Sequence, residues 1–323
     1  MTRITRRSAM ALGLAAMSLS GLPAFAQDYP SKPISLVVSY AAGGGTDAIA
    51  RVFAARLEKA LNGRVIVENR PGAAANIGTE VAAAADPDGY TLLIGNQGPM
   101  VVNPHIFNLK YDPAEALDPI AMIADASLVV VVGPRLPVKS MGEFMEKAKA
   151  GELVYGSAGN ASASHVATLL LGQSADIKLK HVPYKGAGPA VNDLVGGHID
   201  FMVTTIPSVI GLVGDGTLTA LAVTGKDRFP ALPDVPTASE AGVTGYTASA
   251  WYGLLGPKGL PEDVRTKLAA ATAETLADPD FIAKLSNDGG VPSDLSGQGF
   301  ADFMAAERAR WGEVVKAADI KVE

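Results

Sequence analysis

Apolar and polar residues follow two distinct patterns along the chain, and together these patterns predict an α/β fold. Residues 34–40 form a short run rich in β-branched side chains, which is typical of a buried strand. In residues 47–61, apolar side chains recur at every fourth position from Ile49 to Leu61, which places them on one face of a helix. Strands that alternate with such helices form mostly parallel sheets flanked by helices.

The alternation of strand and helix runs through two series, which predicts two lobes. Each series contains a strand, a turn of glycine and hydroxyl residues and a helix start, at 40–47 and again at 155–164. We expect lobe 1 to begin with 27–125, lobe 2 to comprise 126–246, and 247–323 to return to lobe 1. Further strands are predicted at 64–68, 91–94, 128–132, 153–155, 180–184, 199–204, 218–223 and 246–255.

The N-terminal residues have the pattern of a secretory signal peptide. Arg6 and Arg7 precede an apolar run at 9–22, and the small residues of Ala24-Phe25-Ala26 suit a signal peptidase. The run is short for a membrane span and is interrupted by glycine, serine and proline. We therefore expect a signal peptide at 1–26 and a periplasmic protein, exported by the Sec route or by the twin-arginine route that paired arginines suggest.

Composition narrows the function further. The chain has 33 acidic and 27 basic residues, and three of the basic ones belong to the leader, so the exported chain is strongly acidic. An acidic chain is a poor nucleic-acid binder, and we expect no nucleic acid partner. The absence of cysteine excludes disulfides, thiol catalysis and zinc–thiolate sites.

The glycine turn between the first strand and the first helix predicts an anion site. Gly43, Gly44 and Gly45 precede a helix start at Thr46 or Asp47, and the free N–H groups of a first helical turn point at whatever lies in front of them. The spacing also fits a relaxed dinucleotide fingerprint, which leaves an exported dinucleotide-binding enzyme as an alternative. Export and the negative charge of Asp47 argue against a pyrophosphate.

No constellation of residues indicates catalysis. Ser157 lacks the glycine two positions earlier that a nucleophile elbow requires. The four histidines, at 105, 165, 181 and 198, have no metal-ligand spacing, so we expect no metal and no cofactor. For His165, a ligand contact and a plain role at a helix start both stay open. These residues describe a binding protein better than an enzyme.

Ligands of open α/β sheets bind at the carboxyl ends of the strands. By this rule, one wall of a cleft is expected from the loops at 40–47, 69–76 and 95–98, and the other from the loops at 156–164, 184–186 and 204–207. The two crossovers between the lobes, near 122–128 and 246–251, are expected to act as the hinge.

Several segments resemble the receptors of tripartite tricarboxylate transporters, also called the Bordetella uptake gene family. The matching segments are 40–47 with Ala50-Arg51, 67–73, 86–93, 181–186, and Trp251-Tyr252-Gly253 with Gly256-Pro257. The resemblance covers essentially the whole exported chain. In relatives, the first loop commonly carries prolines before the glycines, whereas this chain has Ala41-Ala42.

This resemblance implies a two-lobed periplasmic binding protein, a type II clamshell, that is not an enzyme. Its ligand would be a small organic carboxylate, such as a mono-, di- or aromatic acid, delivered to membrane permease subunits by a monomeric receptor. A ligand sensor for a membrane kinase is the alternative. One ligand carboxylate would be held by the two first-lobe loops, at 40–47 and 73–76.

From the loops on both walls of the expected cleft we predict twenty ligand-binding residues. Ser157, Asn160 and Thr205 are expected at the far end of the ligand. The twenty residues are Tyr40, Ala42, Gly43, Gly44, Gly45, Thr46, Asp47, Ala74, Ala75, Asn76, Asn96, Gln97, Ser157, Asn160, Ser162, His165, Tyr184, Lys185, Thr204 and Thr205.

We predict that Gly44→Val abolishes carboxylate binding with little loss of folding stability, because the first loop needs a close approach of its backbone. Titration calorimetry with the purified protein measures the affinity, and urea denaturation measures the stability. An unchanged affinity in the variant would contradict the prediction.

Overall fold

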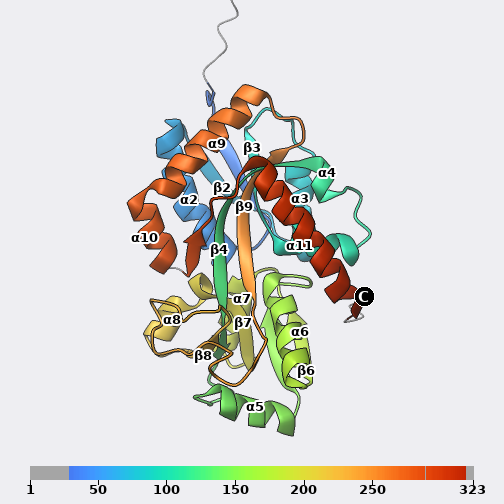
Figure 1. Ribbon diagram of the computed structural model, residues 1–323, viewed down its shortest axis with the longest axis vertical. Coiled ribbons are helices and arrows are strands. Elements are labelled where there is room, and N and C mark those ends of the chain that lie inside the picture. Colours follow the sequence, from blue (N-terminus) through green and yellow to red (C-terminus); the bar gives the residue numbers. More distant parts are fainter. Residues whose placement is uncertain (1–28, 288, 318–323) are drawn as a thin grey trace, which may run out of the picture.

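A computed structural model of the chain describes residues 29–287 and 289–317. The expected signal peptide at 1–26 lies outside the described residues. Within them, no helix is both long and apolar enough to cross a membrane. Figure 1 shows two lobes, one above the other, joined by two long strands that run through both.

The first lobe is built on three parallel strands in the order β2-β1-β3. They are β1 (Ile34–Val38), β2 (Val65–Asn69) and β3 (Thr91–Asn96). Helix α2 (Gly45–Leu61) follows β1, and α3 (Asn76–Ala83) follows β2 after a short 3-10 turn, η2 (Ala73–Ala75). Helix α2 buries Ile49, Phe53 and Leu57, the apolar face that the sequence predicts.

The second lobe repeats this arrangement. Strand β5 (Leu153–Ser157) pairs in parallel with β6 (Leu179–Pro183) and with β7 (Phe201–Thr205), while β8 (Thr219–Val223) pairs with β4. The helices of this lobe are α5 (Met141–Ala150), α6 (Ala163–Ala175), α7 (Ala187–Val195) and α8 (Ile210–Gly214), and the 3-10 turn η5 (Ile206–Ser208) follows β7.

Two long antiparallel strands, β4 (Leu117–Val132) and β9 (Ser249–Pro257), connect the lobes. Asp125 pairs with Trp251 and Ser127 with Ser249 at the crossover, where the two segments of the chain pass between the lobes. The sequence predicts only 128–132 of β4, because acidic residues and Pro119 interrupt the apolar pattern earlier in the strand. The expectation of parallel strands therefore holds within each lobe, whereas the connecting strands pair antiparallel.

The elements after β9 pack on the first lobe. Helix α9 (Glu262–Ala277) and α10 (Pro279–Asn287) pack against α2, and strand β10 (Gly290–Pro292) pairs with β4. Helix α11 (Gly297–Ala317) covers β4 and a π-helical turn, η3 (Gly98–Val102). The short elements η4 (Asn103–His105) and α4 (Pro113–Ala116) complete this side.

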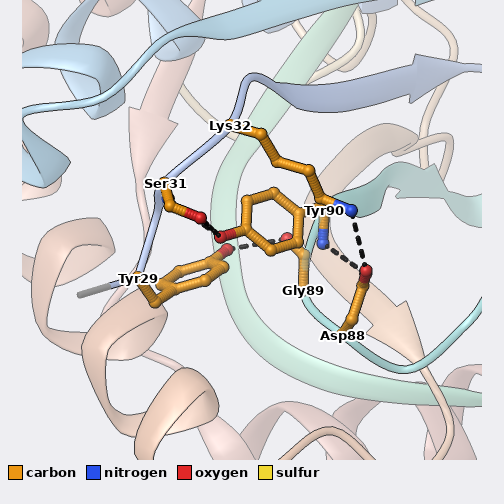
Figure 2. A network of polar contacts seen from close by, with 6 residues as sticks. All are labelled: Tyr29, Ser31, Lys32, Asp88, Gly89 and Tyr90. Atoms are coloured by element: carbon orange, nitrogen blue, oxygen red, sulfur yellow. Dashed lines mark hydrogen bonds and ion pairs between the residues drawn. The ribbon is translucent and has the colours of Figure 1, made fainter. Parts of the chain in front are cut away.

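The start of the described chain is held against the turn before β3, as Figure 2 shows. The Tyr29 hydroxyl donates to the Gly89 carbonyl at 2.7 Å, and its ring meets the Tyr90 ring edge-on. Lys32 pairs with Asp88 at 3.1 Å and lies over the Tyr90 ring. These contacts tie the chain to the first lobe immediately before β1.

Candidate functional site

A narrow cavity of about 40 Å³ lies between the two lobes, at the ends of their strands. The residues that line it come from the first loop, β3, the start of α6, β7 and β9. Its lining comprises Tyr40, Gly44, Gly45, Thr46, Asn96, Ala158, Ser162, Ala163, Ser164, Ala187, Thr204, Thr205, Ala250 and Tyr252. None of these lining residues carries a charge, so a ligand here meets hydroxyl, amide and backbone groups.

On the first-lobe side, a chain of neutral groups lines the cavity. The Tyr40 hydroxyl donates to Asn96 Oδ1 at 3.3 Å, and Asn96 Nδ2 donates to Thr46 Oγ1 at 3.3 Å. Burial raises the pKa of Tyr40 and of Tyr252 well above the ordinary tyrosine value. Both phenols therefore stay protonated and can donate hydrogen bonds at neutral pH.

The backbone N–H groups of the first loop divide into two sets. The Ala41, Gly43 and Gly45 N–H groups donate to Lys185 O, Asp47 Oδ2 and Ser208 Oγ respectively. Those of Gly44, Thr46 and Asp47 have no acceptor among residues 29–287 and 289–317. Gly44 is the N-cap of α2 and has no side chain that could cap the helix. The positive end of α2 thus has N–H groups without an acceptor in the described protein, and anion binding there stays a prediction.

The shape of the first loop is held by the carboxylate of Asp47. It accepts hydrogen bonds from Gly43 N at 3.0 Å, from Arg51 Nε at 3.1 Å and from Asn69 Nδ2 at 3.0 Å. Asn69 Nδ2 also donates to the Tyr40 carbonyl. Burial alone would raise the pKa of Asp47, but the bonds from Arg51, Gly43 and Asn69 outweigh it and lower this pKa overall. The carboxylate is therefore charged and satisfied within the protein.

On the second-lobe side, serine hydroxyls shape the wall. Ser162 is the N-cap of α6 and accepts from the His165 N–H at 3.3 Å. Its hydroxyl lies 3.0 Å from that of Ser164, which accepts from the Ala158 N–H at 2.8 Å. Both walls thus contain a helix start, as the repeated turn pattern indicates, but α6 is capped by the Ser162 side chain, whereas α2 begins at Gly44 without a side-chain cap.

The buried His165 and the partly buried His181 support this wall from behind. The rings of His165 and His181 stack with centroids 4.1 Å apart, and Tyr155 stacks on His181 at 4.8 Å. His165 Nδ1 accepts from the Ala161 N–H at 3.0 Å, and His181 Nε2 lies 2.6 Å from Ser157 Oγ. Burial, with the neighbouring His181, lowers the pKa of His165 to about 3, and burial lowers that of His181 to about 4.

The structure brings eight of the predicted residues to the cavity wall, namely Tyr40, Gly44, Gly45, Thr46, Asn96, Ser162, Thr204 and Thr205. The others lie outside this lining, and their part in ligand binding stays a prediction: Ala42, Gly43, Asp47, Ala74, Ala75, Asn76, Gln97, Ser157, Asn160, His165, Tyr184 and Lys185. Several of these have protein partners instead. Tyr184, for example, donates to Asp193 Oδ2 at 2.6 Å.

The second first-lobe loop has an unusual backbone. Ala73, Ala74 and Ala75 all have positive φ, a conformation that alanine rarely adopts and that clusters at functional sites. Asn103 holds the loop from behind, since its Nδ2 donates to Ala74 O at 2.8 Å and to Asn76 Oδ1 at 2.6 Å. The strained loop agrees with a functional role, although it lies outside the lining of the cavity.

Six lining residues are additional to the prediction, namely Ala158, Ala163, Ser164, Ala187, Ala250 and Tyr252. Three belong to the turn at 156–164 that the strand-end rule already selects. For Tyr252 the signal is strand alternation, because neighbours in a strand face opposite sides. Trp251 packs on Phe300 and Phe303, and its strand neighbour Tyr252 faces the cavity.

We predict that Asp47→Ala lowers the free energy of unfolding by about 2 kcal/mol, because it leaves the Gly43 N–H and the Asn69 amide without their acceptor. Urea denaturation measures the change. Arg265→Ala serves as the control, since Arg265 and Glu262 form an exposed ion pair whose loss should cost at most about 0.5 kcal/mol. Equal changes in the free energy of unfolding for the two substitutions would contradict a stabilising role of the Asp47 contacts.

We also predict that stability falls on acidification below pH 6.5. The pKa values of His165 and His181 lie at about 3 and about 4 in the folded protein, against 6.5 for an ordinary histidine. The unfolded chain therefore takes up protons first, and each histidine contributes a slope approaching about 1.4 kcal/mol per pH unit.

Urea denaturation between pH 7.5 and pH 5 measures this slope in a window where most carboxylates stay ionised. The variant His181→Gln should have a shallower slope than the unsubstituted protein over the same range. A slope that is equal in both proteins would mean that the buried histidine pair does not link folding to pH.

Known proteins with similar sequences share this architecture. The profile of the tripartite tricarboxylate transporter family receptor matches residues 49–320. BugT of Bordetella pertussis is 33% identical over 305 residues, which cover 93% of this chain and 94% of BugT.

Two solved structures are also similar. R. palustris Rpa4515, solved with adipate, has a TM-score of 0.88 and 33% identity, over 91% of this chain and 99% of its own. MatC from Rhodopseudomonas palustris, solved with bound malate, has a TM-score of 0.84 and 31% identity, over 89% of this chain and 100% of its own. The expected two-lobed clamshell and the expectation of a receptor that is not an enzyme are confirmed. The chain belongs to the receptor family of tripartite tricarboxylate transporters.

Proposed function

We propose that this protein captures a small organic carboxylate in the cavity between its lobes and delivers it to a membrane permease of the tripartite tricarboxylate type. The observation that carries the proposal is the open N-terminus of α2, where Gly44 and Thr46 have N–H groups without an acceptor and line a cavity of neutral donors. Relatives solved with adipate and with malate support the ligand class.

The physical chemistry of the cavity suits a reversible receptor. A hydrogen bond from a neutral N–H or O–H contributes about 0.5 to 1.5 kcal/mol, and the dipole of a helix of 17 residues adds a modest attraction for an anion. Several such contacts hold a carboxylate without a buried cation. Release then needs only that the lobes open, since no strong ion pair has to be broken.

We further propose the setting in which the receptor works. The segment 1–26 would direct export by the Sec or the twin-arginine route, and the exported chain would act as a periplasmic monomer. The lobe boundaries would lie at 125/126 and 246/247, within β4 and shortly before β9. Opening would be a hinge motion of the two crossovers.

A thermal-shift screen of the exported chain tests the ligand class. Malate, adipate, citrate and benzoate are each compared with the matching neutral amide. A ligand that binds only the native state at 100 times its Kd stabilises it by about 2.7 kcal/mol, which raises the Tm of a chain of this length by roughly 4 °C. We predict such a rise for at least one acid and none for its amide.

The Gly44→Val variant is the matched control, because it should keep its own Tm and lose the shift. A response to nicotinamide dinucleotides and to no organic acid would contradict the proposal and favour the dinucleotide-binding alternative. Delivery is measured separately, as uptake of the acid by cells that contain the permease, with and without this receptor.

A further inference from the structure

The first loop contacts the second lobe directly through its backbone. The Ala41 N–H donates to the Lys185 carbonyl at 2.9 Å, and the Gly45 N–H donates to Ser208 Oγ at 2.8 Å. Lys185 precedes α7, and Ser208 ends η5, so both acceptors belong to the second lobe. These two bonds join the lobes across the cavity, and they can form only while the lobes are together.

Small residues on both sides make this close approach possible. A Cβ atom built on Gly188 would lie 2.6 Å from the Ala42 carbonyl oxygen, which is closer than real Cβ atoms come to any backbone atom. A Cβ on Gly44 would lie 3.3 Å from the Cβ of Ala187. The backbones of the two lobes are therefore nearly in contact, with no space for a larger side chain between them.

The glycine at 188 is not required by the local backbone. Gly188 is the second residue of α7, and its φ is outside the left-handed region, whereas Gly186 has a φ of +150° that itself favours glycine. Alanine is the better helix former at such a position. The lack of a side chain at Gly188 is accordingly explained by the approach of Ala42 from the other lobe.

From these contacts we propose that the Lys185 carbonyl, Gly188 and Ser208 form a latch for the first loop, which stabilises the closed state and thereby tunes ligand affinity. Affinity falls in proportion when the binding-competent state is less populated. The effect on affinity rests on the proposed receptor function, whereas the effect on closure does not, and the two are measured separately.

The test measures lobe closure by the distance between two spin labels. The chain has no cysteine of its own, so labels can be placed on the exposed residues Ala55 in α2 and Ser174 in α6 after substitution by cysteine. Pulsed electron paramagnetic resonance measures the distance between the two labels, and short and long distances report the closed and open populations. The measurement is made without added acid and with malate, adipate, citrate or benzoate.

Gly188→Ala is expected to lower the ratio of closed to open molecules by roughly tenfold, because its Cβ overlaps Ala42 only when the lobes meet. The matched control is Gly142→Ala, at the second position of α5 in the same lobe, where the nearest atom to a built Cβ is 3.8 Å away. Both variants should keep or raise the Tm of the protein without ligand, since both add a helix former.

Ser208→Ala is the second test variant and adds no atoms. It removes the acceptor of the Gly45 N–H and is expected to lower the closed population by a few-fold. The proposal is overturned if Gly188→Ala retains the closed population of the unsubstituted protein, or if the unsubstituted protein shows no closed population in any condition. The two proposals can fail separately. If no acid raises the Tm but Gly188→Ala still lowers the closed population, the proposed ligand class is contradicted and the latch is supported.

Discussion

The cavity depends on one buried carboxylate, that of Asp47. The glycine turn has no side chains that could pack and fix its shape, so the shape has to come from outside the turn. The Asp47 carboxylate fixes the shape of the turn by accepting hydrogen bonds from Gly43 N, Arg51 and Asn69. The Asn69 amide also donates a hydrogen bond to the Tyr40 carbonyl. The open end of α2, the position of the Tyr40 ring and the contact with the second lobe all follow from this one set of bonds.

The crossover strands β4 and β9 connect the lobe that contains the first loop to the second lobe. At the crossover, Ala250 and Tyr252 face the cavity, while Trp251 between them packs against the rings of Phe300 and Phe303. One face of β9 thus lines the cavity, and the other packs in the core of the first lobe. Strand β4 continues into the second lobe, where it pairs with β7, and the chain returns from that lobe into β9, so the proposed bending at this point would change the distance between the two cavity walls.

The sequence is informative where the structure depends on near neighbours. The helix face of α2 and the first loop follow from residues within a few positions of one another, and so they could be predicted. The first half of β4 could not, because Asp118, Pro119 and Asp125 break its apolar pattern and its pairing with β9 is long-range. The partner of Ser157 could not be predicted either, because this buried side chain contacts His181, which is distant in sequence. The reason for Gly188 lies in Ala42, which is distant in sequence.

An acidic protein that takes an anion needs local attraction to overcome its overall charge. A buried arginine or lysine would supply it, but at the cost of desolvating that cation each time the cavity stood empty of an anion. The lining has no such residue and relies on N–H groups, hydroxyls and phenols that burial keeps protonated. Such neutral groups hold an anion only when many of them surround it, and here they come from both lobes. Under the proposed function, affinity is tied to closure, so the contact between the first loop and α7 would influence binding together with the residues that line the cavity.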